Sequence, residues 1–242
     1  MLSANKIKFI KSLQLKKNRI ESGLFVIEGE KIVSEAISFV PEFIECIYHT
    51  SEYNIKLERL TSELITEKEL SRISGLKSPN KCLALVQIGF HPNVSSDSKG
   101  TLVLDSVNDP GNLGTIIRTA DWFGIREIIC SEDTADILNP KVIQSTMGSL
   151  FHMKITYQNL FEFFSGTSGN IYGAVLNGEN MEDVSFDDDP VIIIGNESKG
   201  ISSEIKSILT HPVTIQKYGL AESLNAGIAT GILLCHWKKR NS

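Results

Sequence analysis

The 242-residue sequence lacks paired cysteines and clusters of metal-ligating side chains. Its four cysteines are scattered, without a CxxC pair or the spacing of a metal site: they are Cys46, Cys82, Cys130 and Cys235. Such cysteines are typical of small buried side chains in a reducing compartment. The five histidines form no ligand cluster either. We therefore expect no metal.

Long apolar runs are also absent. None approaches the ~20 residues that a helix needs to span a bilayer. The first twenty residues lack the apolar core and the cleavage site of a secretory signal. The apolar share of 41% and the charged share of 22% are those of an ordinary globular protein. The sequence thus predicts a cytoplasmic protein with no membrane partner, long enough for one large domain or two smaller ones.

Negative charge is missing from the start of the chain, although the net formal charge is −5. Residues 1–89 hold 13 Lys/Arg and 11 Asp/Glu, whereas residues 90–242 hold 11 and 18. Six basic residues precede the first acidic one: Lys6, Lys8, Lys11, Lys16, Lys17 and Arg19. Such a cluster can neutralise RNA phosphates and release counterions. A solvated helix face is the simpler interpretation unless another feature points to RNA.

The stretch FHPNVSSDSKG, residues 90–100, has the composition of a linker and no periodic apolar pattern. It predicts a small domain over 1–90, a linker over 91–100 and a larger domain over 101–242. In the first part, LFVIEGEKIVSEAISF predicts a strand that runs into a helix. FIECIYHT and CLALVQIGF predict further strands, with a short helix at TEKELSRIS between them. The first part is therefore expected to be a small α/β unit.

Short apolar runs alternate with helical patterns in the larger part. TLVLD, EIIC, IYGAV, VIII and VTI are typical of strands buried on both faces. The helical patterns lie at about 114–124, 139–148, 202–209 and 221–236. This order predicts an α/β fold with a mostly parallel sheet and helices on both sides. Ligands of such sheets bind outside the carboxyl ends of the strands, so the loops after Asp105, Ile194 and Ile215 are the expected sites.

The first of these loops lies in DSVNDPGNLGTIIRTADWFG, residues 105–124, and carries a strong turn signal at NDPG. A helix beginning near Leu113 would place an apolar stripe along one face, formed by Leu113, Ile116, Ile117, Ala120 and Phe123. Asn112 precedes this helix, and Arg118 lies off the stripe. Taken alone, the segment predicts a strand, a loop and a helix whose arginine faces solvent.

The second loop follows the β-branched run in VIIIGNESKGIS, residues 191–202. Gly195 would let a ligand approach the backbone closely. Glu197, at the end of the strand, could accept hydrogen bonds from a ligand or orient a cationic group. A plain turn before a helix capped by Ser202 is the alternative. The GxxxxGK[ST] spacing of a phosphate-binding P-loop is absent.

The third loop leads from a short strand ending near Ile215 into a helix at ESLNAGIATGILL. Ser223 or Asn225 could cap this helix or point into the ligand crevice. Glycine inside a helix is unfavourable by about 1 kcal/mol relative to alanine, so Gly227 and Gly231 indicate close packing against another backbone. That backbone could belong to a neighbouring helix of the same chain or to a second subunit.

In this order, the three loops resemble the signature motifs of the SpoU/TrmH family, which are S-adenosylmethionine-dependent RNA ribose 2′-O-methyltransferases of the SPOUT class. NPKVIQSTMGSLFHMKI, between the first two motifs, is also similar to that family, and the resemblance covers about residues 101–237. The N-terminal KFIKSLQLKKNRIESGLFVIEGEKIVSEAI is similar to the ribosomal-protein-like substrate-binding domain of many members. The resemblance implies a small N-terminal RNA-binding domain, a trefoil knot in the C-terminal domain, a homodimer and S-adenosylmethionine held among the knotted loops.

The resemblance also implies roles for individual residues. The catalytic set is Arg118, Asn112, Glu197, Ser223 and Asn225. The residues expected to bind S-adenosylmethionine, largely through backbone groups, are Gly195, Ile215, Leu224, Ile194 and Asn196. The six basic residues of the N-terminal cluster become the expected RNA-binding set.

Family mechanisms give the base role to the arginine of the first motif, here Arg118. A guanidinium keeps its proton up to a pH above ~12 and is an awkward base. Arg118 would therefore bind the phosphate beside the target ribose, and either take the proton late or orient the hydroxyl.

Several alternatives remain open at this point. Gln216 and Lys217 stand where a Pro-Met pair is usual in the family, and Ser198 stands where glycine is common, so the shape of the donor pocket is not predicted. The N-terminal domain favours ribosomal RNA as substrate over transfer RNA. A non-catalytic RNA-binding protein on the same fold is a further alternative. A nucleotide-dependent Rossmann enzyme is disfavoured because no GxGxxG follows the first strand.

Overall fold

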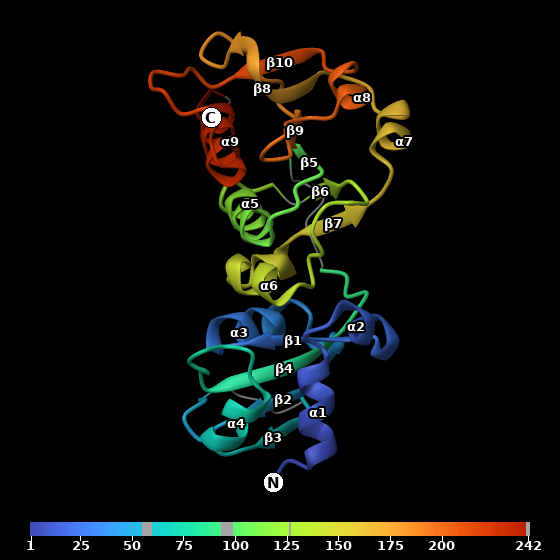
Figure 1. Cartoon of the computed structure of the whole chain (residues 1–242), viewed down its shortest axis with the longest axis vertical. Coiled ribbons are helices and arrows are strands. Elements are labelled where there is room, and N and C mark those ends of the chain that lie inside the picture. Colours follow the sequence, from blue (N-terminus) through green and yellow to red (C-terminus); the bar gives the residue numbers. More distant parts are fainter. Residues whose placement is uncertain (55–59, 93–98, 126, 241–242) are drawn as a thin grey trace. The chain divides into compact units, whose positions relative to one another are not determined.

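The computed structural model describes residues 1–54, 60–92, 99–125 and 127–240. The chain forms two compact units (Figure 1). Unit 1 comprises Met1–Asn93 and Ile137–His152, and unit 2 comprises Val94–Asp136 and Met153–Ser242. Of the predicted linker over 91–100, residues 93–98 lie outside the described residues.

Unit 1 is built on a four-stranded sheet in the order β1-β4-β2-β3. β4 pairs antiparallel with both β1 and β2, and β3 pairs parallel with β2. The strands are β1 (Leu24–Glu28), β2 (Ile44–His49), β3 (Ser62–Leu64) and β4 (Cys82–Gln87). The helices are α1 (Ala4–Ser12), α2 (Lys16–Ser22), α3 (Glu30–Phe39), α4 (Glu67–Ile73) and α6 (Pro140–Thr146), with 3₁₀ turns at Pro41–Phe43 and Ser149–His152. The predicted strands and helices of this part are confirmed, and the short β3 was not predicted.

Segment Ile137–His152 belongs to unit 1, although the sequence prediction placed it in the larger domain. Its buried apolar side chains are Val142, Ile143, Leu150 and Phe151. The Phe151 ring lies 5.4 Å from that of Phe90, and Gln144 Nε2 donates to the Glu28 carbonyl at 3.1 Å, at the end of β1. A domain boundary inferred from linker composition alone does not predict that this segment joins unit 1, because the packing of its apolar side chains decides the assignment.

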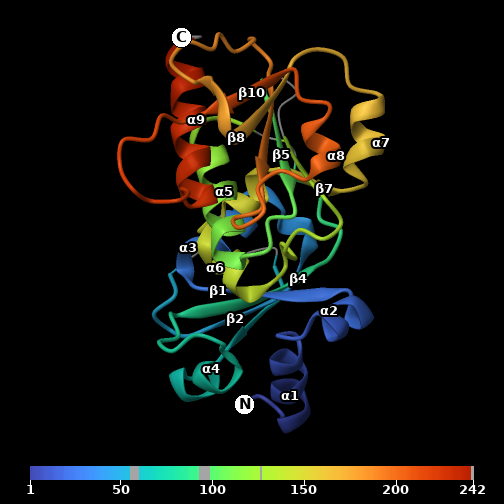
Figure 2. The same ribbon diagram turned by 45° about the horizontal axis from the view of Figure 1, so that its top comes forward.

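Unit 2 holds a six-stranded sheet in the order β10-β8-β9-β5-β6-β7, and each neighbouring pair is parallel. The strands are β5 (Thr101–Asp105), β6 (Glu127–Cys130), β7 (Lys154–Tyr157), β8 (Ile171–Asn180), β9 (Val191–Gly195) and β10 (His211–Thr214). The helices are α5 (Pro110–Trp122), α7 (Leu160–Ser165), α8 (Ser203–Lys206) and α9 (Ala226–Arg240). α5 and α9 lie on one face of the sheet and α7 and α8 on the other (Figures 1 and 2). The α/β fold with a parallel sheet is confirmed.

No helix of the described residues is long and apolar enough to cross a membrane.

β5 and β9 are neighbours at the centre of the unit 2 sheet. Their register pairs Asp105 with Gly195, the last residue of each strand. Because the strands are parallel, both end at the same edge of the sheet. The first and second predicted loops therefore emerge side by side, as the pattern of parallel strands requires.

α9 packs along α5 within the same unit. A Cβ added at Gly227 would lie 2.8 Å from Thr115 Cγ2, and one at Gly231 would lie 3.6 Å from Thr119 Cγ2. The two helices therefore run in the same direction, and α9 lies closer to α5 at Gly227 than at Gly231. The close packing predicted from the glycines is made by a helix of the same chain.

Candidate functional site

Three of the predicted catalytic side chains form one hydrogen-bonded chain at the carboxyl edge of the unit 2 sheet. Asn112 Nδ2 donates to Glu197 Oε1 at 2.8 Å. Asn225 Nδ2 donates to Asn112 Oδ1 at 2.6 Å. The three residues follow β5, β9 and β10, so the bonds join all three predicted loops.

The orientation of both amides follows from their partners. An ionised carboxylate only accepts hydrogen bonds, so Asn112 presents its nitrogen to Glu197 and its oxygen to Asn225. Asn225 Oδ1 accepts from the backbone amides of Gly227 at 2.9 Å and Ile228 at 3.2 Å. Asn225 is thus the cap of α9, a role that the sequence left open between Ser223 and Asn225. Its nitrogen is left to donate to Asn112.

α5 begins three residues earlier than predicted. Asp109 is the N-cap, and its Oδ1 accepts from the Asn112 amide at 2.8 Å. Pro110 occupies the first helical position, where its missing N–H costs no hydrogen bond. Asn112 consequently lies in the first turn of a helix rather than in a free loop, which fixes its backbone beside Glu197.

The second loop is closed by Asn196, which was predicted to bind the donor. Its backbone exchanges hydrogen bonds with Gly200, at 3.0 and 2.9 Å, and its Oδ1 accepts from the amides of Ser198 and Lys199 at 2.9 and 3.0 Å. A Cβ at Gly195 would lie 2.3 Å from the backbone of Gly200 and Ile201. The space beside Gly195, which we expected a ligand to approach, is therefore filled by the loop itself.

Arg118 and Ser223 are exposed. Within the described residues, no hydrogen bond or ion pair joins either of them to the Asn112–Glu197–Asn225 chain. The solvent-facing position of Arg118 matches the expectation from its helical pattern. One turn further along α5, Trp122 is 85% exposed. Trp122 was not among the predicted site residues, although its place four residues after Arg118, off the apolar stripe, predicts an exposed side chain on the same face.

The residues predicted to hold a donor lie around the ends of β9 and β10. Ile194 is buried, Ile215 is half-buried and Leu224 is exposed. Between 216 and 224, no backbone group pairs with another backbone group in the described part of the chain. The Lys217 carbonyl accepts from Gln216 Nε2 at 3.3 Å. The other amides and carbonyls of this loop have no hydrogen-bond partner among the described residues and lie beside apolar side chains. No group of three or more His, Cys, Asp or Glu side chains suited to a metal occurs among the described residues.

The N-terminal lysines lie on α1 and α2 of unit 1. Lys8, Lys11 and Lys16 are exposed, and their ammonium groups have no partner among the described side chains. Lys6 pairs with Glu63 at 3.0 Å, and that hydrogen bond raises the pKa of Lys6 to about 12. Lys17 pairs with Glu21 at 3.7 Å. Three of the five lysines are thus free to meet phosphates.

Arg19 does not fit the predicted RNA-binding set. Its side chain is buried, with 3% of the residue exposed. One guanidinium nitrogen donates to the carbonyls of Leu13 at 3.0 Å and Gln14 at 2.9 Å, at the end of α1. The guanidinium thus satisfies carbonyls that a helix end leaves unpaired. It cannot reach an RNA phosphate unless the contact between α2 and the end of α1 unfolds.

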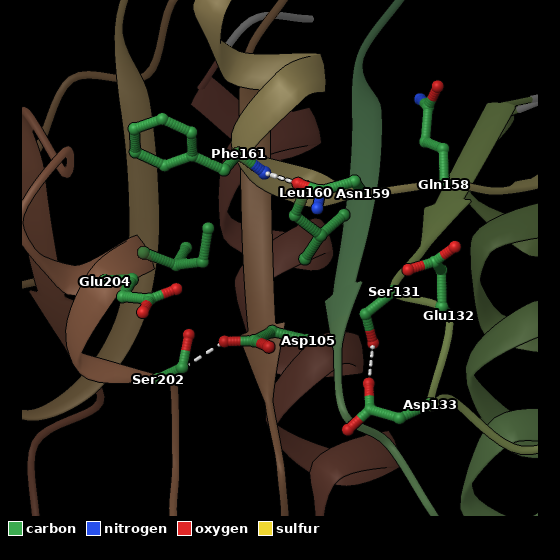
Figure 3. Close-up of a pocket in the computed structure, with 11 residues that line it drawn as sticks. Asp105, Ser131, Glu132, Asp133, Gln158, Asn159, Leu160, Phe161, Ser202 and Glu204 are labelled. Carbon is green, nitrogen blue, oxygen red and sulfur yellow. Dashed lines mark hydrogen bonds between the residues drawn. The ribbon is translucent and has the colours of Figure 1, made fainter.

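A pocket of about 280 Å³ opens at the carboxyl ends of β5, β6 and β7, next to the starts of α7 and α8 (Figure 3). Four carboxylates line it, from Asp105, Glu132, Asp133 and Glu204, and no basic side chain does. None of the predicted site residues lines it. Because its carboxylates would repel phosphate, this pocket is unsuited to the RNA backbone.

The family comparisons agree with the arrangement of the three loops. Residues 99–235 match the model of the SpoU rRNA Methylase family, and residues 4–84 match the MRM3-like substrate binding domain. The 23S rRNA (guanosine(2553)-2′-O)-methyltransferase RlmP of Bacillus subtilis strain 168 is 31% identical over 238 residues, which are 96% of this chain and 95% of RlmP.

Solved structures are similar over nearly the whole chain. A TrmH-family protein from Porphyromonas gingivalis superposes with a TM-score of 0.87 and 34% identity, covering 99% of both chains. The AdoMet-bound rRNA methyltransferase of Sinorhizobium meliloti gives a TM-score of 0.85 with 27% identity, covering 99% of this chain and 97% of that one. The chain therefore belongs to the SpoU rRNA methylase family.

Proposed function

We propose that this protein transfers a methyl group from S-adenosylmethionine to a ribose 2′-hydroxyl of RNA, with ribosomal RNA as the substrate. The observation that carries the proposal is the Asn112–Glu197–Asn225 chain, in which the three signature loops meet through hydrogen bonds of 2.6 and 2.8 Å. Membership of the family supports the reaction. The similarity to RlmP, named as acting on 23S rRNA, supports the substrate.

The residues at the ends of β9 and β10 fit a donor of this kind. Apart from the Lys217 carbonyl, the backbone groups of 216–224 have no partner among the described residues and can bind polar atoms. Ile215 and Leu224 offer apolar contacts at either end of that loop. The donor, when bound, supplies a methyl group on a sulfonium. On the side of β9, the Asn196 backbone is already paired with Gly200 and the space beside Gly195 is filled. Ile194, Gly195 and Asn196 would therefore border the donor site without binding the donor through their backbone groups.

Positioning is the main task of the protein's own residues, because aligning two reactants can supply ~7–11 kcal/mol of a barrier. Arg118 is exposed on α5 and would bind the phosphate next to the target ribose. That contact would orient the hydroxyl and lower the cost of losing its proton. Glu197 keeps Asn112 in one orientation, and Asn112 in turn fixes Asn225. Ser223, on the exposed loop before α9, would complete the ribose pocket.

RNA binding is assigned to unit 1 as well. Lys8, Lys11 and Lys16 have no ion-pair partner in the described part of the chain, and their charges can replace RNA counterions. Lys6 and Lys17 would contribute less, since each is already paired with a glutamate. The match of residues 4–84 to a substrate-binding domain supports this assignment.

The proposal includes a cytoplasmic homodimer with a knotted C-terminal domain. Large apolar side chains are exposed on α5, on α9 and on the loop before α9. They are Trp122, Tyr218, Leu220, Leu224 and Ile228. Monomeric proteins rarely leave so much apolar surface in water, and a second copy would cover it. Light scattering of the wild type and of Ile228→Asp tests this: a dimer that Ile228→Asp dissociates supports it, and a monomeric wild type overturns it.

The test of the reaction is direct. The full-length protein is incubated with tritiated S-adenosylmethionine and RNA from cells that lack it, and the RNA is then separated by size. Label in the large ribosomal RNA, as an alkali-resistant 2′-O-methyl nucleotide, is the expected result. Label in transfer RNA would show that transfer RNA is the substrate in place of ribosomal RNA. Donor binding without label in any fraction would favour a non-catalytic RNA-binding protein.

A further inference from the structure

Ser106, the first residue after β5, has a left-handed backbone with φ of +58°. This conformation is unfavourable for a residue with a side chain, and it persists only where the surroundings hold it. Ser106 opens the loop that leads to Asn112. The conformation of this one residue therefore sets the direction in which the loop leaves the sheet.

Side chains from two other loops hold every polar group of Ser106. Its amide donates to Ser131 Oγ at 2.8 Å, and its hydroxyl donates to Asp133 Oδ2 at 2.6 Å. Its carbonyl accepts from Asn196 Nδ2 at 2.8 Å. Ser131 and Asp133 follow β6, and Asn196 follows β9. Ser106 is thus fixed from both neighbouring strands.

Asp133 sets the direction of these bonds. Its second oxygen, Oδ1, accepts from Ser131 Oγ at 2.6 Å (Figure 3). A carboxylate only accepts, so both serine hydroxyls turn their protons toward it. Ser131 then has only lone pairs left for the Ser106 amide. The two hydroxyls also lower the pKa of Asp133, so it stays an acceptor at more acidic pH than an ordinary aspartate.

The loop from Ser106 to Asn112 is consequently attached at both ends to the second loop, which follows β9. Asn196 binds Ser106 at the start, and Glu197, its neighbour in sequence, binds Asn112 at the end. A change at Ser106 would shift Asn112 relative to Glu197. Small displacements of this kind are costly for a reaction that depends on alignment.

We propose that Asp133 is a positioning residue for methyl transfer: it holds Ser106 in its left-handed conformation and thereby places Asn112 against Glu197. The inference rests on the proposed function for its effect on the reaction. Asp133 is assigned no contact with either substrate and acts through Ser106 and Ser131.

The test uses the full-length protein and the variant Asp133→Ala. Glu132→Ala is the matched control, because it removes a carboxylate from the same loop that makes no hydrogen bond among the described residues. We expect Asp133→Ala to lower kcat at least tenfold, with the KM for RNA and the donor Kd changed less than twofold, and Glu132→Ala to match the wild type. A purely structural role would lower the amount of folded protein and leave kcat per folded molecule unchanged.

The double variant Ser106→Gly/Asp133→Ala separates positioning from other roles of the carboxylate. Glycine adopts positive φ without help. We expect this variant to recover most of the kcat lost in Asp133→Ala. An Asp133→Ala enzyme with wild-type kcat would overturn the proposal, and so would an unchanged loss in the glycine background.

A spectroscopic readout keeps the inference independent of the reaction. In protein labelled with ¹⁵N-asparagine, the side-chain amide signals of Asn112 are assigned by their loss in Asn112→Ala. We expect Asp133→Ala to shift them and Glu132→Ala to leave them in place. If the wild type methylates no RNA but these signals move, the proposed function fails and the positioning contact stands. Unmoved signals overturn the positioning role itself.

Discussion

Asn225 donates a hydrogen bond to Asn112 across 2.6 Å, although 113 positions separate the two residues. The same Asn225 caps α9 through the amides of Gly227 and Ile228. The start of a helix and the polar centre of the site are therefore fixed by one side chain. Any change that moves the start of α9 should also move Asn112, and through it Glu197.

Asn112→Asp should abolish most activity without unfolding the protein. The substitution keeps the shape of the side chain but places a second carboxylate oxygen 2.8 Å from Glu197. The two carboxylates repel each other at this distance, so the substituted side chain would move away from Glu197. We expect kcat to fall by about 100-fold, as for other small displacements of reacting groups.

Asn159→Asp is the matched control for this substitution. Asn159 caps α7 by accepting from the amides of Phe161 and Glu162, and aspartate caps a helix equally well. Activity should stay at the wild-type value. Equal activity of Asn112→Asp and Asn159→Asp in the tritium assay would show that the Asn112–Glu197 bond is not needed.

Arg118→Ala should separate donor binding from methyl transfer. Arg118 is exposed, and among the described residues no hydrogen bond or ion pair joins it to those assigned to the donor. Calorimetry should therefore give a wild-type Kd for S-adenosylmethionine, while tritium transfer to RNA falls by at least 100-fold. Lys206→Ala, which removes an exposed cation from α8, is the control and should transfer normally. Normal transfer by Arg118→Ala would refute the assignment.

The centre of the unit 2 sheet was predictable because β5, β6 and β9 are short, apolar and largely buried. TLVLD and EIIC coincide with β5 and β6 residue for residue. The start of α9 was predicted least accurately. Its pattern suggested a start at 221, whereas Asn225 caps the helix and the residues just before Asn225 are exposed. Capping depends on the hydrogen bonds of one polar side chain, which an apolar pattern does not encode.

The site was predictable where the family motifs fix residues and unpredictable where tertiary contacts decide. The motifs grouped Asn112, Glu197 and Asn225, and hydrogen bonds join these three side chains in the structure. They gave no hint of Ser106, because a left-handed serine depends on partners that follow other strands. For Arg19 the sequence pattern predicted the wrong role. It belongs to a basic run in the sequence, but its buried guanidinium caps the end of α1 in unit 1.

Removing three unpaired lysines should weaken RNA binding and its salt dependence together. Each lost phosphate contact reduces the slope of log K against log salt by about 0.7 to 0.9. The triple variant of Lys8, Lys11 and Lys16 to alanine should thus lower the slope by about 2 to 3 in fluorescence anisotropy with a labelled ribosomal RNA fragment. The same change at Lys154, Lys206 and Lys239 is the control. Identical slopes for both variants would exclude α1 and α2 from the RNA contact.

Acid should weaken unit 1 through Glu69. Its carboxylate accepts from the amides of Leu2 at 2.7 Å and Thr66 at 3.0 Å, and these bonds lower the pKa of Glu69 from 4.5 to about 2. A folded-state pKa below the unfolded value stabilises the fold above pH 4.5, and this contribution is lost as the pH falls toward 2.

Glu69→Gln should therefore lower the urea midpoint at pH 6 and converge with the wild type near pH 2. Glu67→Gln, in the same first turn of α4 but exposed, should follow the wild type throughout. The urea midpoint is read by circular dichroism at each pH. A Glu69→Gln deficit that is equally large at both ends of the pH range would contradict the linkage.

Two alanine substitutions in α9 should have opposite effects on stability. A methyl group at Gly231 meets only Thr119 Cγ2, at an ordinary 3.6 Å, so Gly231→Ala should gain up to about 1 kcal/mol from helix propensity. A methyl group at Gly227 would lie 2.8 Å from Thr115 Cγ2 and 3.2 Å from Asn225 Oδ1.

Overpacking of this kind costs about 1–3 kcal/mol, and threonine is stiff at χ1, so Gly227→Ala should be destabilising despite the same propensity gain. Because the new methyl group also presses on Asn225, Gly227→Ala should lose activity while Gly231→Ala keeps it. Adding Thr115→Ser removes the methyl that clashes and should restore part of the lost stability. Urea unfolding and the tritium assay measure both properties. If both substitutions changed the free energy of unfolding in the same direction, α9 would not approach α5 at Gly227 as closely as the structure shows.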